Sequence, residues 1–349
     1  MDMKKTIGLT YNLKTEWKAG ECDPKDASAE FDKPETIDRV VKVLENGGFA
    51  VKRIGNVEDL LKQLDHLDVD IVFNLCEGKK GRNRESEVPV FLEMKGIPFV
   101  GSDGLTMGIT LDMVVAKQVF VAEEIPTPRY FVMNKGDSVQ QLNKIGYPLI
   151  VKTSREGSSK GISKDSKVTD LASLRKRAQL IIETYDQPAL VEDFIRGMEC
   201  TVAVIGNDPV QVMPIVQTTI DGKFQLGEEF YTNARIYSNA IKYVCPAQFS
   251  TGLIKKIEDI AARAYKAVGC RDFARIDFRI DEKENPYVLE INPLPSLDYE
   301  DAFNIFPQTI GSSYDEMIIK IINFALERYG LLEYDKSQKE KNCDSLVNR

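Results

Sequence analysis

Two short stretches of the chain alternate charged or amide side chains with apolar ones. They are Arg275-Ile276-Asp277-Phe278-Arg279 and Leu289-Glu290-Ile291-Asn292. Because successive side chains of a strand point to opposite faces, Arg275, Asp277 and Arg279 share one face. The same rule puts Glu290 and Asn292 on one face of the second stretch. The turn-like residues 281–286 between them predict an antiparallel hairpin.

A hairpin whose loop is centred on residues 283–284 sets Asp277 opposite Glu290 and Arg275 opposite Asn292. Like charges directly opposite one another destabilise a sheet, so a cation between the two carboxylates is expected. Carboxylate and amide oxygens suit Mg²⁺ or Mn²⁺. The alternative is a solvated strand face. The apolar residues that flank both stretches favour the metal site.

A second candidate site begins at the expected strand 149–152. The residues that follow, 154–161, read Ser-Arg-Glu-Gly-Ser-Ser-Lys-Gly. Small residues allow backbone N–H groups to approach phosphate oxygens, and Lys152 at the strand end can add a positive charge. No Gly-Lys-Ser/Thr sequence follows, so this is not a P-loop. By itself, an ordinary mobile loop explains the composition equally well. Residues 190–195 form a strand leading into a hinge that could meet an adenine edge, although a plain buried strand explains them too.

Composition limits the chemistry. The 349 residues carry a net charge of -8, with a pI near 5.1, which argues against nucleic acid or an anionic membrane as the main partner. The only histidine, His66, lies in a polar stretch, so Ser-His-Asp triads and histidine zinc sites lack their parts. Six cysteines without paired spacing and the absence of a signal-peptide pattern predict a soluble cytoplasmic protein.

The elements that position these residues follow from hydrophobic periodicity. Strands alternate with helices over the first hundred residues, which predicts a parallel sheet covered on both faces. A helix over residues 111–124 ends before Pro126-Thr127-Pro128. The expected class is α/β, with an α+β C-terminal part. The expected domains are 1–110 (Rossmann-like), 111–205 (small central), 206–330 (C-terminal, with the metal site) and a polar tail, 331–349.

In this order the motifs resemble those of the ATP-grasp superfamily, and specifically of D-alanine–D-alanine ligases. Residues 152–159 are similar to that family's Lys-Pro-Ser-Arg-Glu-Gly-Ser-Ser loop. Residues 270–277 are similar to its Gly-Cys…Arg-Ile-Asp strand, and residues 289–292 to its Leu-Glu-(Ala/Val/Ile)-Asn strand. The resemblance covers residues 101–329 well and the first hundred more loosely.

The resemblance implies an ATP-dependent ligase that joins a carboxylate to an amine through an acyl-phosphate, with ATP and two Mg²⁺ (or Mn²⁺) ions as cofactors. Its substrates would be a small-molecule amino acid or amine, and a homodimer is compatible with it. The implied catalytic residues are Arg275, Ser158 and Ser296. The implied nucleotide contacts are Lys117, Lys152, Ser159, Glu192, Phe194, Ile195 and Glu199. The implied metal ligands are Asp277, Glu290 and Asn292.

The chain departs from the family pattern where substrates would bind. The family's Asp-Lys pair is Asp112-Met113 here, and Lys117, one helical turn on, is the nearest substitute. Residues 77–84 replace a His-Gly…Gly-Glu-Asp-Gly segment, and residues 9–17 hold no counterpart of the family's glycine-rich loop. Pro295-Ser296 replaces Pro-Gly, and Asp301-Ala302 replaces the Ser-Leu pair that receives the acceptor's carboxylate.

Three other functions are alternatives to this one. The first keeps the mechanism and joins other amino acids or amines. The second is a nucleotide-binding protein without catalysis, which the changes at Met113 and Ser296 would permit. A Rossmann oxidoreductase is excluded because the first strand leads into residues 10–13, Thr-Tyr-Asn-Leu, with no glycine-rich turn.

Overall fold

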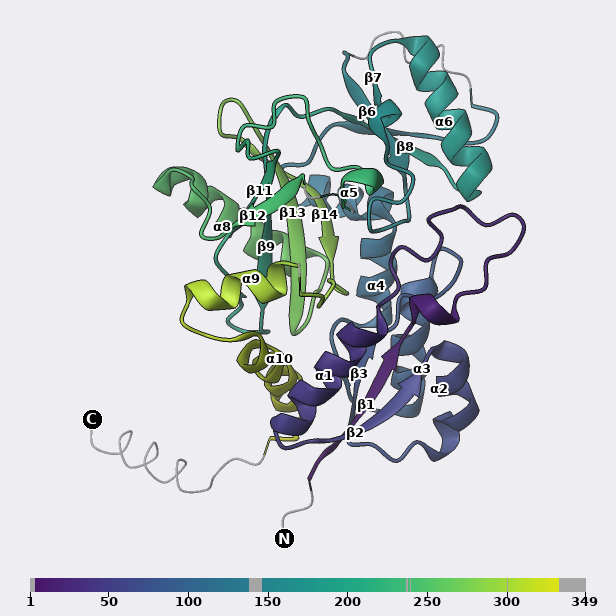
Figure 1. Ribbon diagram of the computed structural model, residues 1–349, viewed down its shortest axis with the longest axis vertical. Coiled ribbons are helices and arrows are strands. Elements are labelled where there is room, and N and C mark those ends of the chain that lie inside the picture. The colour runs from purple at the N-terminus through teal and green to yellow at the C-terminus, as the bar shows by residue number, and fades with distance from the viewer. Residues whose placement is uncertain (1–3, 138–145, 237, 239, 300, 333–349) are drawn as a thin grey trace.

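The computed structural model describes residues 4–137, 146–236, 238, 240–299 and 301–332. Three β-sheets organise these residues (Figure 1). The N-terminal sheet lies at the lower right of the view, the small sheet at the upper right and the large sheet at the left. The expected polar tail lies almost entirely outside the described residues.

The N-terminal sheet is parallel, with strand order β2-β1-β3-β4. Its strands are β1 (Thr6–Tyr11), β2 (Ala50–Gly55), β3 (Ile71–Leu75) and β4 (Phe99–Val100). Helix α1 (Pro34–Asn46) packs on one face, and α2 (Val57–Gln63) and α3 (Glu87–Lys95) pack on the other. The predicted parallel sheet with helices on both faces is therefore confirmed.

The helix predicted over residues 111–124 is present as α5 (Met113–Ala122). A helix that was not predicted, α4 (Gly104–Leu111), precedes it, and the two meet at Asp112 with a bend of 98°. The Asp112 carboxylate accepts from the backbone N–H groups of Val114 and Val115, so it caps α5 and forces the restart. Within the described ranges no single helix has the length and apolarity to span a membrane. This bent pair passes that test by length and composition only.

The small sheet is antiparallel, with order β5-β8-β6-β7. Its strands are β5 (Tyr130–Met133), β6 (Leu149–Thr153), β7 (Lys167–Val168) and β8 (Ala189–Asp193). Helix α6 (Leu171–Tyr185) covers one face through a core that includes Leu174, Ala178 and Ile181. The other face is left to line the site.

The large sheet has order β12-β11-β9-β13-β14, and β10 also pairs with β9. Its strands are β9 (Gly197–Ile205), β10 (Gln211–Val212), β11 (Val216–Ile220), β12 (Ile241–Val244), β13 (Phe273–Asp281) and β14 (Pro286–Asn292). Residues 213–215 separate β10 from β11. A one-turn helix, α7 (Asn233–Ile236), precedes β12.

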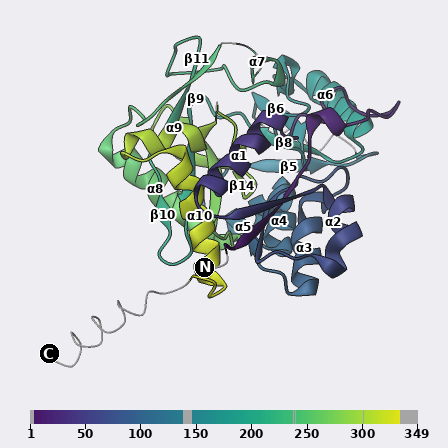
Figure 2. The ribbon, with the colours of Figure 1, turned by 60° about the horizontal axis from the view of Figure 1, so that its bottom comes forward.

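Helices cover the large sheet unequally. Helix α8 (Thr251–Ala267) packs on one face. Helices α9 (Ala302–Thr309) and α10 (Tyr314–Arg328) join α1 and the N-terminal sheet in one shared core, and Figure 2 shows α1 beside α10. Because β9 pairs with β13 along its whole length, we propose a boundary near residue 195 between the second and third domains, rather than at 205.

Candidate active site

The hairpin of β13 and β14 has the predicted register where the charged residues lie. Asp277 pairs with Glu290 and Arg275 pairs with Asn292. The register then shifts, so that Phe278 pairs with Val288. On the other side of β13, Thr201 of β9 is opposite Asp277, and its hydroxyl donates to Asp277 at 2.5 Å. Asp277 is thus held from both neighbouring strands.

Arg275 is fixed by two carboxylates. Its Nε and Nη2 donate to the two oxygens of Asp277 at 3.0 Å each, and its Nη1 donates to Asp301 at 3.3 Å. The Asn292 amide also donates to Asp277, at 3.1 Å. These contacts hold the guanidinium and the amide beside one another on the face of the hairpin.

Glu290 is compensated less completely. Burial raises its pKa and the negative charge of Asp277 raises it further, and these effects outweigh the opposing ones of Lys152, Arg275 and a hydrogen bond with Asn292. Among the described residues no group of three or more His, Cys, Asp and Glu side chains is placed to hold a metal ion. The candidate metal site therefore consists of two carboxylates and one amide. Bound Mg²⁺ commonly takes one or two protein carboxylates, with substrate phosphates as further ligands.

Two buried lysines meet one carboxylate behind this hairpin. Glu192 is 1% exposed; its two oxygens lie 2.6 Å from Nζ of Lys117 and 3.0 Å from Nζ of Lys152. Burial alone would raise the pKa of Glu192, but the two lysines lower it below its usual value. Burial acts to lower the pKa of Lys152, but the negative charges of Glu192, Glu290 and Asp277 raise it above its usual value.

Lys117 does not line the cavity in which the nucleotide is expected. Lys117 is completely buried, its Nζ also contacts the Thr127 hydroxyl at 2.6 Å, and it does not line the cavity described below. Burial lowers its pKa. Met113 lines the cavity instead. We therefore propose that Lys117 compensates Glu192 rather than substituting for the family's lysine.

The hinge after β8 is held by a buried arginine. Arg279 donates to the carbonyl oxygen of Ile195 at 2.8 and 3.1 Å and to the carboxylate of Glu199 at 3.0 Å. Phe194 packs edge-on against Phe230, with ring centroids 5.6 Å apart. These contacts hold residues 192–195 and the Glu199 carboxylate, all of which line the cavity described below.

The glycine-serine loop adopts a constrained conformation. Ser158 and Ser159 have φ values of 47° and 54°, in the left-handed region that non-glycine residues seldom adopt. The turn closes through a hydrogen bond from Lys160 N to Gly157 O at 2.9 Å. Both serines line the cavity, so the strain lies where the phosphates were expected.

A buried ionic cluster that holds this loop was not predicted. The carboxylate of Glu30 contacts Arg84 at 2.7 Å and Lys160 at 2.7 Å, and it accepts from Gly157 N. Arg84 lies in the segment that departs from the family pattern, but nothing in the sequence links it to Glu30. The cluster joins the N-terminal part of the chain to the glycine-serine loop.

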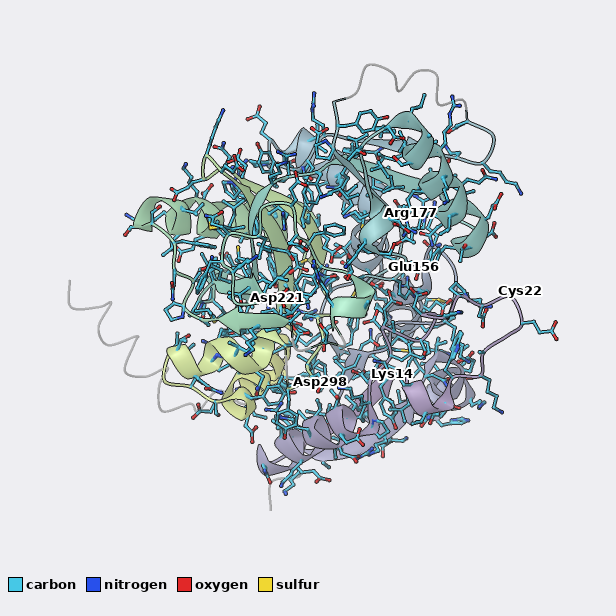
Figure 3. All side chains as sticks on the ribbon, turned by 45° about the horizontal axis from the view of Figure 1, so that its top comes forward. Lys14, Cys22, Glu156, Arg177, Asp221 and Asp298 are labelled. Atoms are coloured by element: carbon cyan, nitrogen blue, oxygen red, sulfur yellow. The ribbon has the colours of Figure 1, made fainter. Side chains whose placement is uncertain are left out.

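One cavity of about 1200 Å³ unites these groups. Its wall includes every residue of the predicted site except Lys117. Figure 3 labels three lining residues: Glu156 lies toward the small sheet, and Lys14 and Asp298 lie below it. The cavity wall thus combines the carboxylates of the hairpin, the ammonium of Lys152 and the loop of Ser158 and Ser159. Such a set of groups can position and neutralise a phosphorylated ligand.

A small antiparallel sheet facing a large one, with a paired-strand carboxylate site between them, defines an ATP-grasp ligase. The family model described as D-ala D-ala ligase C-terminus matches residues 119–323. The chain therefore belongs to the D-alanine–D-alanine ligase family, whose members are ATP-dependent enzymes that use a divalent metal.

Individual relatives agree with this assignment. The D-alanine–D-alanine ligase of Carboxydothermus hydrogenoformans is 30% identical over 300 residues, which is 84% of this chain and 93% of the relative. A Sinorhizobium fredii protein described as uncharacterized protein y4sG is 36% identical over 267 residues, 74% of this chain and 75% of the relative. The Bacillus anthracis D-alanine–D-alanine ligase crystallised with ATP has the same fold, with a TM-score of 0.73 and 22% identity over 93% of this chain and 98% of that one.

Proposed function

We propose that this enzyme activates a small carboxylic acid with ATP and joins it to an amine in the cavity described above. The observation that supports this most strongly is the pairing of Asp277 with Glu290 in the same cavity as Lys152. Two neighbouring carboxylates in one cavity with a buried lysine suit a metal-bound triphosphate better than any neutral ligand.

The nucleotide would lie between the two antiparallel sheets. The backbone of residues 192–195 would contact the adenine, and Glu199 would accept from the ribose hydroxyls. Lys152 would place its charge on the phosphates, and the loop of Ser158 and Ser159 would close over them with backbone N–H groups. The ATP complex of the Bacillus anthracis ligase supports a nucleotide in this fold.

We propose that two Mg²⁺ ions bind here and that Mn²⁺ can replace them. Their protein ligands would be Asp277, Glu290 and Asn292. The donor set fits, because hard oxygen ligands suit these ions and the carboxylates of Asp277 and Glu290 lie opposite one another in the pairing. When bound, the metal supplies charge neutralisation for the phosphoryl groups.

In the first chemical step a carboxylate oxygen of the donor attacks the terminal phosphorus and ADP leaves. In the second, the amine nitrogen attacks the acyl carbon, phosphate leaves, and an amide forms. Arg275 would stabilise the negative charge that builds up in both steps. Ser296, at the cavity wall after Asn292, and Ser158 would orient the acyl group. Each of these side chains positions or neutralises, and none acts as a nucleophile.

The test is ADP release from the purified protein with ATP, Mg²⁺ and a panel of amino acids, with hydroxylamine as a small acceptor. Hydroxylamine traps an acyl-phosphate as a hydroxamate, so the first step is detected without the natural amine. We expect ADP and hydroxamate in equal amounts with at least one carboxylate. Nucleotide binding without ADP release would favour the non-catalytic alternative instead.

A further inference from the structure

The cavity wall contains a place that would ordinarily attract a substrate carboxylate. Helix α9 begins there with Ala302, and the free N–H groups of a helix N-terminus favour anions. The guanidinium of Arg275 lies beside it, because both groups contact Asp301. A helix N-terminus and an arginine together form an anion site.

In this protein that site is already filled by the chain's own carboxylate. Oδ1 of Asp301 accepts from Ala302 N at 2.7 Å and from Arg275 Nη1 at 3.3 Å. The other two donors of Arg275 go to Asp277. A substrate carboxylate would have to displace Asp301 or lie against it, and like charges repel at that distance.

Two other lysines on the cavity wall also have acidic neighbours. Nζ of Lys33 lies 2.7 Å from Asp298. Burial lowers the pKa of Lys14, Lys33 lowers it further, and the negative charge of Asp32 acts in the opposite direction. Lys14 and Lys33 are therefore poor sites for a substrate carboxylate, whereas Lys242, which lines the same cavity, makes no ion pair with the described residues.

Two further carboxyl groups, Glu77 and Glu85, line the same cavity. Burial and the charges of Glu85 and Glu30 raise the pKa of Glu77 well above its usual value. Bringing another anion here would increase the repulsion, whereas a cation would relieve it.

We propose that the acceptor is a primary amine that carries no carboxylate next to its amino group, rather than an α-amino acid. This inference rests on the proposed function. The amine, as its neutral form, makes the new C–N bond while the acyl C–O bond to phosphate breaks. Phosphate leaves with the electron pair, and the nitrogen loses a proton to water. The acidic wall gathers the protonated amine before this step.

The experiment compares matched pairs that differ only by the α-carboxylate: alanine and ethylamine, lysine and cadaverine, arginine and agmatine. Binding to the full chain with a non-hydrolysable ATP analogue and Mg²⁺ is measured by calorimetry, and amide formation is measured by mass spectrometry with the donor found by hydroxamate trapping. We expect the amine of at least one pair to bind about tenfold more tightly than its amino acid. Tighter or equal binding of the amino acid in every pair, or binding of no amine, overturns the inference.

A variant sharpens the test. Asp301→Asn removes the charge but keeps a good helix cap, so α9 should stay folded. It should shift the ratio of amino acid to amine affinity about tenfold toward the amino acid. Asp315→Asn, a matched change in the first turn of α10, should leave the ratio unchanged. An unchanged ratio in Asp301→Asn contradicts the role given to Asp301. Hydroxamate formation does not depend on the natural acceptor. If hydroxamate forms but amines bind no better than amino acids, only this inference fails and the proposed function stands.

Discussion

Asp277 and Glu290 are directly opposite one another on neighbouring antiparallel strands. Arg275 and Thr201 satisfy the oxygens of Asp277, while burial and Asp277 together raise the pKa of Glu290. Such a pair is destabilising as a structural feature, so its placement is explained by the ions it would bind.

Neutralising either carboxylate should abolish turnover. Asp277→Asn or Glu290→Gln should lower the rate of ADP release by about 10² or more, because preorganised charge at the phosphoryl group is lost. The measurement is steady-state ADP release across a Mg²⁺ titration. Glu282→Gln, in the exposed turn of the same hairpin, is the control and should behave as the wild type. Full activity of Glu290→Gln at ordinary Mg²⁺ would argue against the metal assignment.

Met113→Lys should strengthen nucleotide binding. Met113 lines the cavity where the family carries lysine, and an added ammonium there would contact the phosphates. We expect the Kd of a non-hydrolysable ATP analogue to fall about threefold to tenfold, by calorimetry. Met113→Leu keeps an apolar side chain and should change nothing. Weaker binding by a folded Met113→Lys protein would mean that residue 113 is not near the phosphates.

Lys117→Met should affect stability more than binding. It leaves the buried Glu192 with Lys152 as its remaining lysine, and removing one partner of a buried ion pair costs about 3–5 kcal/mol. Urea unfolding of the ligand-free protein measures this, with the exposed Lys255→Met as control. If Lys117→Met unfolds like Lys255→Met but binds nucleotide poorly, Lys117 contacts the nucleotide after all.

Stability should fall as pH rises through the acid range because of Asp32. Burial raises the pKa of Asp32 to about 7, against an ordinary value of 3.8. Between these values the folded protein binds a proton that the unfolded chain does not, so raising the pH destabilises the fold. We expect the free energy of unfolding to drop by ~2 kcal/mol between about pH 5 and about pH 8, and Asp32→Asn to reduce this drop. An identical pH profile in Asp32→Asn would show that the carboxyl titrates normally.

Much of the site could be predicted because it depends on local pattern. Strand alternation and a short turn fix which of the residues 275–279 face residues 290 and 292, and the register is confirmed at the charged positions. The shift in strand register beyond Asp277 could not be predicted from the alternation of side chains. Leu289 and Ile291 also line the cavity, although alternation places them on the face opposite Glu290 and Asn292.

The features of the site that were not predicted depend on contacts between distant segments of the chain. Glu30 and Gly157 are 127 positions apart, and their hydrogen bond exists only because the N-terminal segment folds back over the glycine-serine loop. The position of Lys117 depends likewise on Glu192, on another element. Helix α4 is a different case, because Asp103 directly before it is a visible cap signal that was not used.

The most direct test of the central claim is the location of bound metal. Crystals grown with Mn²⁺ and a non-hydrolysable ATP analogue would show the ions by anomalous scattering. The proposed mechanism predicts manganese bridging the phosphates and the oxygens of Asp277 and Glu290, with Lys152 on the phosphates. Nucleotide bound without manganese at this pair, or manganese bound away from it, would contradict the assignment.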